Sequence, residues 1–95
     1  MEDITYEISY SEIFIKDIEK HKKSGQKTIL KKIDQLIDEL RQHPYSGTGN
    51  PEPLGYNRNG QWSRRINKKH RLIYEVNEDI VTVILISAIG HYGDK

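Results

Sequence analysis

The chain has 95 residues, with 15 Lys and Arg against 14 Asp and Glu, a formal net charge of +1 and no cysteine. This length predicts one domain, over residues 1–95, and the lack of cysteine excludes disulfides and thiolate metal sites. No apolar run approaches the ~20 residues of a membrane span. The N-terminus is acidic, with Glu2 and Asp3, and does not resemble a secretory signal, so we expect a cytoplasmic protein without a membrane partner.

The charges are distributed unevenly along the chain. Residues 1–19 carry six acidic residues and one lysine, whereas residues 58–71 carry six basic residues and no acidic one. A basic segment attracts polyanions such as nucleic acids. Charged runs are more often solvated strands or turns, so this pattern alone leaves a nucleic-acid site and a solvated surface both open.

The N-terminal part of the sequence predicts a strand followed by a helix. Apolar and polar residues alternate over residues 4–8, as they do in a half-buried strand. Ser9 and Glu12 have the spacing of a capping box, in which each side chain accepts a hydrogen bond from the other residue's backbone N–H. We therefore expect the helix to begin at Ser9 and to end at the Ser-Gly pair of residues 24–25.

The rest of the chain predicts a second helix, a long loop and three strands. The helix has apolar residues at i, i+4, i+7, i+8 and i+11, namely Ile29, Ile33, Leu36, Ile37 and Leu40, and it must end before Pro44. Residues 43–61 contain all three prolines and four of the seven glycines, which predicts a loop. Strands are expected over residues 62–66, 70–76 and 80–88. The last strand is continuously apolar, so we expect it to be central and buried on both faces.

This order of elements, β-α-α-β-β-β, predicts an α+β fold with two helices packed on one face of a sheet. The fourteen isoleucines, against six leucines, also favour a core of sheet and helix over an all-helical bundle. No repeat or linker interrupts the pattern.

Glu52 is a candidate general base because it lies between two prolines. Pro51 fixes its own φ angle, and Pro53 restricts Glu52 to an extended conformation, so the carboxylate projects from a stiff backbone. A rigid surface corner with a solvated glutamate would have the same sequence, and most glutamates are solvated. Both interpretations remain open from these residues alone.

Arg71 is a candidate for binding phosphate. Strand alternation puts Arg71 on one face and its neighbours His70 and Leu72 on the other. A guanidinium can bind a phosphate through two hydrogen bonds and stabilise charge on its oxygens in a transition state. A cross-strand ion pair with Glu7 or Glu75 is an equally good explanation of this arginine.

His91 is the natural candidate for a general acid, because an imidazole with a pKa near ~6.5 exchanges protons at cellular pH. It follows Gly90 directly after the last predicted strand, although a histidine near a chain end usually has no such role. The other histidines, His21, His43 and His70, lack metal-binding spacing, so we expect neither a metal nor another cofactor. The sequence also lacks a glycine-rich phosphate loop and a GxSxG motif, which disfavours nucleotide-triphosphate and serine-hydrolase chemistry.

Four ordered segments of the chain resemble one known family. They are residues 49–54 (GNPEPL), 60–66 (GQWSRRI), 70–74 (HRLIY) and the terminal pair His91-Tyr92. In this order and spacing they resemble the Txe/YoeB family of toxins from type II toxin–antitoxin modules, within the RelE-like superfamily. The resemblance is strong over about residues 43–76 and the His-Tyr pair, and the first forty residues agree in their strand-helix-helix pattern.

The resemblance implies a RelE-like fold, a curved and mainly antiparallel sheet with two helices against one face and the active site on the other. It also implies an mRNA interferase, which cuts mRNA in the ribosomal A site during translation without a metal. The catalytic residues of the family fall on Glu52, Arg71, His91 and Tyr92. Glu52 would take the proton of the ribose 2′-hydroxyl, Arg71 would stabilise the phosphorane-like transition state, and His91 would protonate the leaving 5′-oxygen.

Other basic and aromatic residues would hold the RNA in this scheme. Tyr92 would stack on a base or orient the scissile phosphate. Contacts to mRNA or ribosomal RNA phosphates are expected from Arg64, Arg65, Lys68 and Lys69. Because Arg64 and Arg65 are consecutive on a strand, at most one can reach the active site, and we expect it to be Arg65.

The resemblance further implies partners. They are a cognate antitoxin of the YefM/Phd type, the 70S ribosome with its mRNA, and a second copy of the chain in a homodimer. Two departures from the family are notable. Gly55 occupies a position where members often have a basic residue, and the chain continues beyond the His-Tyr pair with three residues, 93–95.

Two other functions compete with the nuclease. One is a ribosome- or RNA-binding domain of the same fold that does not cut, and the other is a module whose basic face docks an acidic protein. The combination of Glu52, Arg71 and His91 favours the nuclease, because binding alone does not require an acid, a base and a guanidinium together.

Overall fold

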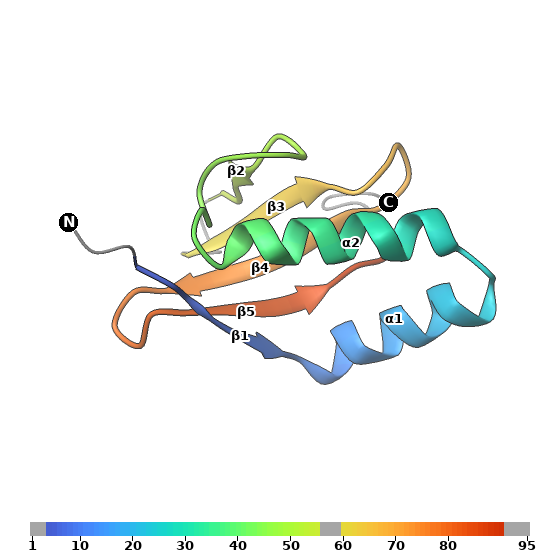
Figure 1. Ribbon diagram of the computed structural model, residues 1–95, viewed down its shortest axis with the longest axis horizontal. Coiled ribbons are helices and arrows are strands. Elements are labelled where there is room, and N and C mark those ends of the chain that lie inside the picture. The colour runs from blue at the N-terminus through green and yellow to red at the C-terminus, as the bar shows by residue number, and fades with distance from the viewer. Residues whose placement is uncertain (1–3, 56–59, 91–95) are drawn as a thin grey trace.

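The computed structural model describes residues 4–55 and 60–90. Its elements follow one another as β1 (Glu7–Tyr10), α1 (Glu12–Lys23), α2 (Lys27–Leu40), β2 (Glu52–Pro53), β3 (Gln61–Arg65), β4 (Arg71–Asn77) and β5 (Thr82–Ser87) (Figure 1). The predicted α+β class and the order of helices and strands are confirmed. The sequence did not predict β2, a two-residue strand inside the expected loop of residues 43–61.

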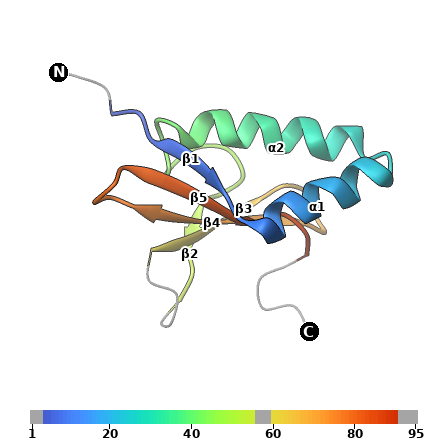
Figure 2. The ribbon, with the colours of Figure 1, turned by 90° about the horizontal axis from the view of Figure 1, so that it is seen from below.

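The five strands form one mixed sheet in the order β1-β5-β4-β3-β2. β1 pairs with β5 in parallel, and the other neighbours are antiparallel. Both helices lie on the same side of this sheet (Figure 2). The described part of the chain contains no helix that is long and apolar enough to cross a membrane.

The expectation for the last strand is wrong in part. β5 is an inner strand, between β1 and β4, but the central strand is β4. Val83 and Leu85 of β5 are fully buried, whereas Ile84 between them and Ile86 after them are only half-buried. The reason is that the helices cover one face of the sheet and leave the other open.

The core lies between α2 and the covered face of the sheet. Leu36 and Leu40 of α2 are completely buried, and so are Leu72 and Tyr74 of β4. The predicted apolar stripe of α2 is therefore the face that packs on the sheet. Fully burying side chains of this size contributes about 1.5–3 kcal/mol each.

The start of α1 also differs from the prediction. The N-cap is Ser11, whose Oγ accepts a hydrogen bond from the backbone N–H of Phe14 (3.0 Å) and donates one to the carbonyl of Ile86 (2.7 Å). Ser9, the predicted cap, is still part of β1, where it pairs with Ile84 of β5. Pairing with β5 extends the strand by two residues, a long-range contact that a local capping pattern does not contain.

Candidate active site

The open face of the sheet brings together residues from three strands. Glu52 of β2 lies opposite Ser63 of β3, and Arg65 of β3 lies opposite Arg71 of β4. Residues two apart on a strand share a face, so Glu52, Ser63, Arg65 and Arg71 lie on one face. Leu72 points into the core, which confirms the predicted alternation and puts Arg71 on the face away from the helices.

Glu52 and Arg71 form the centre of this group. Oε1 of Glu52 lies 3.6 Å from Nη1 of Arg71, and the same nitrogen donates a hydrogen bond to Oγ of Ser63 at 3.3 Å. The Glu52 side chain is 52% exposed and the Arg71 side chain only 14%. Arg71 thus has a fixed position against the sheet, while the carboxylate beside it faces solvent.

The ion pair between these two groups is loose. Charge-assisted hydrogen bonds are usually about 2.7–2.9 Å long, whereas this pair is 3.6 Å apart. The Arg71 side chain contacts Glu52 and Ser63. The cross-strand ion pair with Glu7 or Glu75, considered as an alternative from the sequence, is therefore not the contact that it makes. Ser63 was missed by the sequence analysis, because its role follows from the pairing of β2 with β3.

Three further basic residues lie near one end of this face. Arg65 is exposed and opposite Arg71 in the β3–β4 pair, as expected if the turn preserves the alternation. Lys68 and Lys69 are exposed in the turn between the two strands. Oδ1 of Asn67 accepts hydrogen bonds from the backbone N–H groups of Lys69 and His70 and so fixes the shape of that turn.

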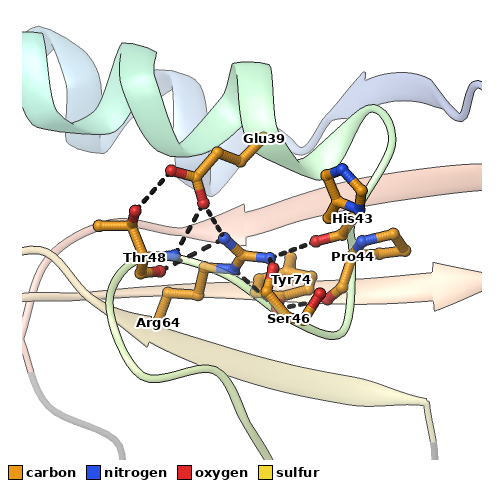
Figure 3. A network of polar contacts seen from close by, with 7 residues as sticks. All are labelled: Glu39, His43, Pro44, Ser46, Thr48, Arg64 and Tyr74. Carbon is orange, nitrogen blue, oxygen red and sulfur yellow. Dashed lines mark hydrogen bonds and ion pairs between the residues drawn. The ribbon is translucent and has the colours of Figure 1, made fainter.

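The expected phosphate contact of Arg64 needs a correction. Its side chain is completely buried on the opposite face of β3, where it forms a 2.9 Å ion pair with Glu39 of α2 (Figure 3). Strand alternation correctly predicted that Arg64 and Arg65 lie on opposite faces of β3. The partner of Arg64, Glu39, lies 25 residues away in the sequence, so no local pattern indicates the ion pair. Arg64 therefore belongs to the interior and presents no charge to RNA.

The predicted residues His91 and Tyr92 lie outside the described residues. The backbone that leads to them is fastened at Gly90, whose carbonyl accepts a hydrogen bond from the N–H of Arg71 (2.8 Å) and whose N–H donates to Nδ1 of His70 (3.0 Å). Gly90 has a φ of +82°, a conformation that glycine adopts without strain. Gly90, the last described residue, thus lies beside the backbone of Arg71.

Ala88, two residues before Gly90, is held by two side chains of α1. Oδ2 of Asp17 accepts from the N–H of Ala88 (2.9 Å), and Nε2 of His21 donates to its carbonyl (3.0 Å). Both side chains are buried, and the His21 ring contacts that of His70 with 5.0 Å between the centroids. Neither Asp17 nor His21 had been given a role from the sequence, because their partner Ala88 lies 71 and 67 residues away and leaves no local signal.

The site shows no sign of a metal centre within residues 4–55 and 60–90, where no three His, Asp or Glu side chains gather closely enough to hold an ion. Gly55, two residues beyond β2, is exposed and has open space where a side chain would begin. The structure therefore leaves room for the basic residue that the family often carries there.

Comparison with known proteins agrees with this arrangement. A sequence profile described as "YoeB-like toxin of bacterial type II toxin-antitoxin system" matches residues 10–92. The chain belongs to this family of YoeB-like toxins. It is 46% identical to toxin YoeB of Escherichia coli K12 over 66 residues, which are 70% of this chain and 76% of the relative.

Two solved structures extend the likeness to the whole fold. The YoeB dimer from Staphylococcus aureus superimposes with a TM-score of 0.79 at 32% identity, covering 93% of this chain and 99% of that one. A heterotetrameric YoeB-YefM toxin–antitoxin complex from the same species gives a TM-score of 0.76 at 33% identity, covering 92% and 98%. The fold is accordingly RelE-like, as expected from the sequence.

Proposed function

We propose that this YoeB-family toxin acts as a single domain in the cytoplasm and is a ribosome-dependent endoribonuclease. It cuts translated mRNA in the A site and so inhibits translation. The observation that carries the proposal is the placement of Glu52, half-exposed, 3.6 Å from a largely buried Arg71 on the open face of the sheet. A base and a guanidinium at this distance can span one ribose-phosphate linkage.

Glu52 is the general base in this mechanism. Its carboxylate takes the proton from the ribose 2′-hydroxyl, and the 2′-oxygen attacks the adjacent phosphorus. A group of this kind contributes about 10²–10⁴ in rate. The exposure of Glu52 supports the assignment, since a substrate hydroxyl can approach the carboxylate from solvent.

Arg71 stabilises the transition state. As the 2′-oxygen attacks, negative charge builds up on the non-bridging phosphate oxygens, and a pre-positioned guanidinium lowers the energy of that charge. The hydrogen bond to Ser63 holds Nη1 in place, so little reorganisation is needed when the phosphate arrives. The phosphate takes the place of the loose contact between Arg71 and Glu52.

His91 and Tyr92 complete the proposal. His91 protonates the departing 5′-oxygen, which leaves a 5′-hydroxyl and a 2′,3′-cyclic phosphate that water can open to a 3′-phosphate. Tyr92 stacks on a base or orients the scissile phosphate. The support from the described residues is the hydrogen bond between the backbone N–H of Arg71 and the carbonyl of Gly90, the last described residue before His91.

The RNA backbone follows the exposed basic residues. Arg65, Lys68 and Lys69 contact phosphates of mRNA or ribosomal RNA, and binding therefore weakens steeply with salt. No metal or other cofactor takes part in the chemistry that we propose.

The partners follow from the same relatives. We propose that a cognate antitoxin of the YefM/Phd type covers the catalytic face, as the YoeB-YefM complex suggests, and that the toxin also forms a homodimer, as the YoeB dimer suggests. The 70S ribosome supplies the substrate.

Primer extension on an actively translated message tests the nuclease. The wild-type chain should produce discrete cuts, and Glu52→Ala should lose them by a factor of 10² or more. Glu19→Ala, which removes an exposed glutamate from α1, is the matched control and should cut normally. Protection of the message without cuts would favour a binding domain, and full cutting by Glu52→Ala would show that the base is misassigned.

A further inference from the structure

Arg64 is the most completely buried charged residue among those described, and nothing in the proposed chemistry uses it. Its guanidinium forms the ion pair with Glu39 (2.9 Å), and its Nε donates to the hydroxyl of Tyr74 (3.2 Å). That hydroxyl donates in turn to the carbonyl of Pro44 (2.7 Å). Burial raises the pKa of Tyr74, which keeps the hydroxyl protonated as a donor.

The other hydrogen bonds of Arg64 all go to one loop. They are donated to the carbonyls of His43 (2.5 Å), Ser46 (2.7 Å) and Thr48 (3.3 Å) (Figure 3). Glu39 binds the same loop from α2, because its carboxylate accepts from the backbone N–H of Thr48 (2.8 Å) and from its hydroxyl (2.5 Å). Residues 43–48 are thus tied to β3 and α2 at several points.

This attachment continues directly toward Glu52. The carbonyl of Gly49 accepts from the N–H of Arg65 (2.6 Å), and Gly49 packs so closely that a Cβ there would lie 2.8 Å from the Arg65 carbonyl. Asn50, with a φ of 53°, turns the chain, and β2 begins two residues later. The loop therefore delivers Glu52 to the sheet from a fixed starting point.

We propose that Arg64, together with Glu39, is a positioning residue for Glu52, a role that rests on the proposed function. The planar guanidinium supplies donors in a fork that no lysine reproduces. A buried ion pair is weak grounds for stability, since a hydrophobic pair often serves as well. An apolar pair, however, would leave three loop carbonyls without a donor, and the loop would no longer hold the carboxylate near Arg71.

The electrostatics of Glu39 fit this role. Burial raises the pKa of Glu39, but the hydrogen bonds from Thr48 and from Arg64 outweigh that effect, so the pKa lies below its ordinary value. The carboxylate is ionised at neutral pH and accepts from both the loop and the arginine.

The test is a double-mutant cycle on single-turnover cleavage of ribosome-bound mRNA. We expect Arg64→Lys to lower the cleavage rate on the order of 10²-fold, with the half-saturating ribosome concentration nearly unchanged, because small misplacement of a base costs that much. In a Glu52→Ala background the same change should cost less than about threefold, since there is no base left to position. Arg41→Lys, at an exposed arginine, is the matched control.

If Arg64→Lys does not fold, two milder substitutions at Thr48 test the same proposal. Thr48→Val removes the hydroxyl that binds Glu39, and Thr48→Ser keeps it. Thr48→Val should lower the cleavage rate several-fold and speed exchange of the Thr48 amide, and Thr48→Ser should restore both. Amide exchange reports the loop without any assay of activity.

Either of two results would overturn the inference. One is an equal loss from Arg64→Lys with and without Glu52, which is the behaviour of a purely structural residue. The other is a wild-type cleavage rate for a folded Arg64→Lys or Thr48→Val protein. If Glu52→Ala alone cleaved normally, the proposed function would fail instead, so the two failures can be told apart.

Discussion

The two segments that precede the proposed base and acid are held in different ways. The loop before Glu52 is fastened by the ion pair between the partly exposed Glu39 of α2 and the fully buried Arg64 of β3. Arg64 donates to carbonyls of residues 43–48, and Glu39 accepts from the N–H of Thr48. The segment before residue 91 is fastened by Asp17 and His21 of α1, which bind Ala88, and by His70, which binds Gly90.

The comparison shows that each helix contributes more than an apolar face. On the base side of the site, which is the loop before Glu52, α2 binds the backbone through the carboxylate of Glu39. On the acid side, which is the segment of residues 88–90, α1 binds the backbone through Asp17 and His21. In both cases a polar side chain of a helix binds backbone groups of a segment just ahead of a proposed catalytic residue. The base side depends on two full charges, so changes there should have the larger effects.

The largest effect is expected from Arg64→Met. It leaves Glu39 without its cation and three loop carbonyls without donors. Breaking a fully buried pair costs about 3–5 kcal/mol, and the loss here should lie near the lower end because the Glu39 side chain is 27% exposed. Urea unfolding measures the loss. Adding Glu39→Met should recover part of the lost stability, because the uncompensated carboxylate is then gone, and a further loss in the double variant would contradict the ion-pair account.

A smaller loss is expected on the acid side from Asp17→Ala. The N–H of Ala88 would lose its acceptor in a buried place, which costs about 1–3 kcal/mol. Asp17→Asn keeps an oxygen in that place and should lose less. If Asp17→Ala proved as destabilising as Arg64→Met, the proposed difference between the two sides would be wrong.

The pH dependence of stability tests the contribution of Glu39 on the base side. Because the folded pKa of Glu39 is lowered from its ordinary value of about 4.5, its carboxylate stabilises the fold above that pH. This contribution is lost as the pH falls through the folded pKa. In urea melts between pH 7 and pH 3, Glu39→Gln should therefore flatten the fall in the free energy of unfolding, and an unchanged slope would refute the assignment.

The smallest effect is expected from Gly55→Lys, which adds a cation to the base side only. A Cβ at this position would meet no atom within 4 Å, so the fold should tolerate the substitution. An exposed cation near a phosphate contributes up to about 1 kcal/mol. Binding to ribosomes should tighten a few-fold at low salt and return to the wild-type value at high salt, whereas salt-independent tightening would point to a different contact.

Much of this arrangement could be predicted from local patterns. The period of Ile33, Leu36 and Leu40 fixed the buried face of α2, and alternation in β4 put Arg71 on the open face. The two prolines around Glu52 indicated a stiff backbone, although they gave no sign that the residue would pair with β3.

The remaining features depend on contacts between distant residues. The burial of Arg64 follows from Glu39 and from a loop whose path no local pattern specifies, so a basic residue in a basic segment was taken for an RNA contact. The cap at Ser11 depends on how far β1 pairs with β5. The links from Asp17 and His21 to Ala88 join the first helix to the end of the last strand.

The most direct test of the proposed mechanism removes the nucleophile, the ribose 2′-hydroxyl. A translated message carrying a single 2′-deoxynucleotide on the 5′ side of the cleaved bond is placed in the A site, and cleavage by the wild-type chain is followed by primer extension. The cut should disappear at that position, while an all-ribose message should be cut and leave a 5′-hydroxyl end. Cleavage of the deoxy-substituted message at the ordinary rate would contradict the mechanism, because Glu52 would then be activating something other than the 2′-hydroxyl.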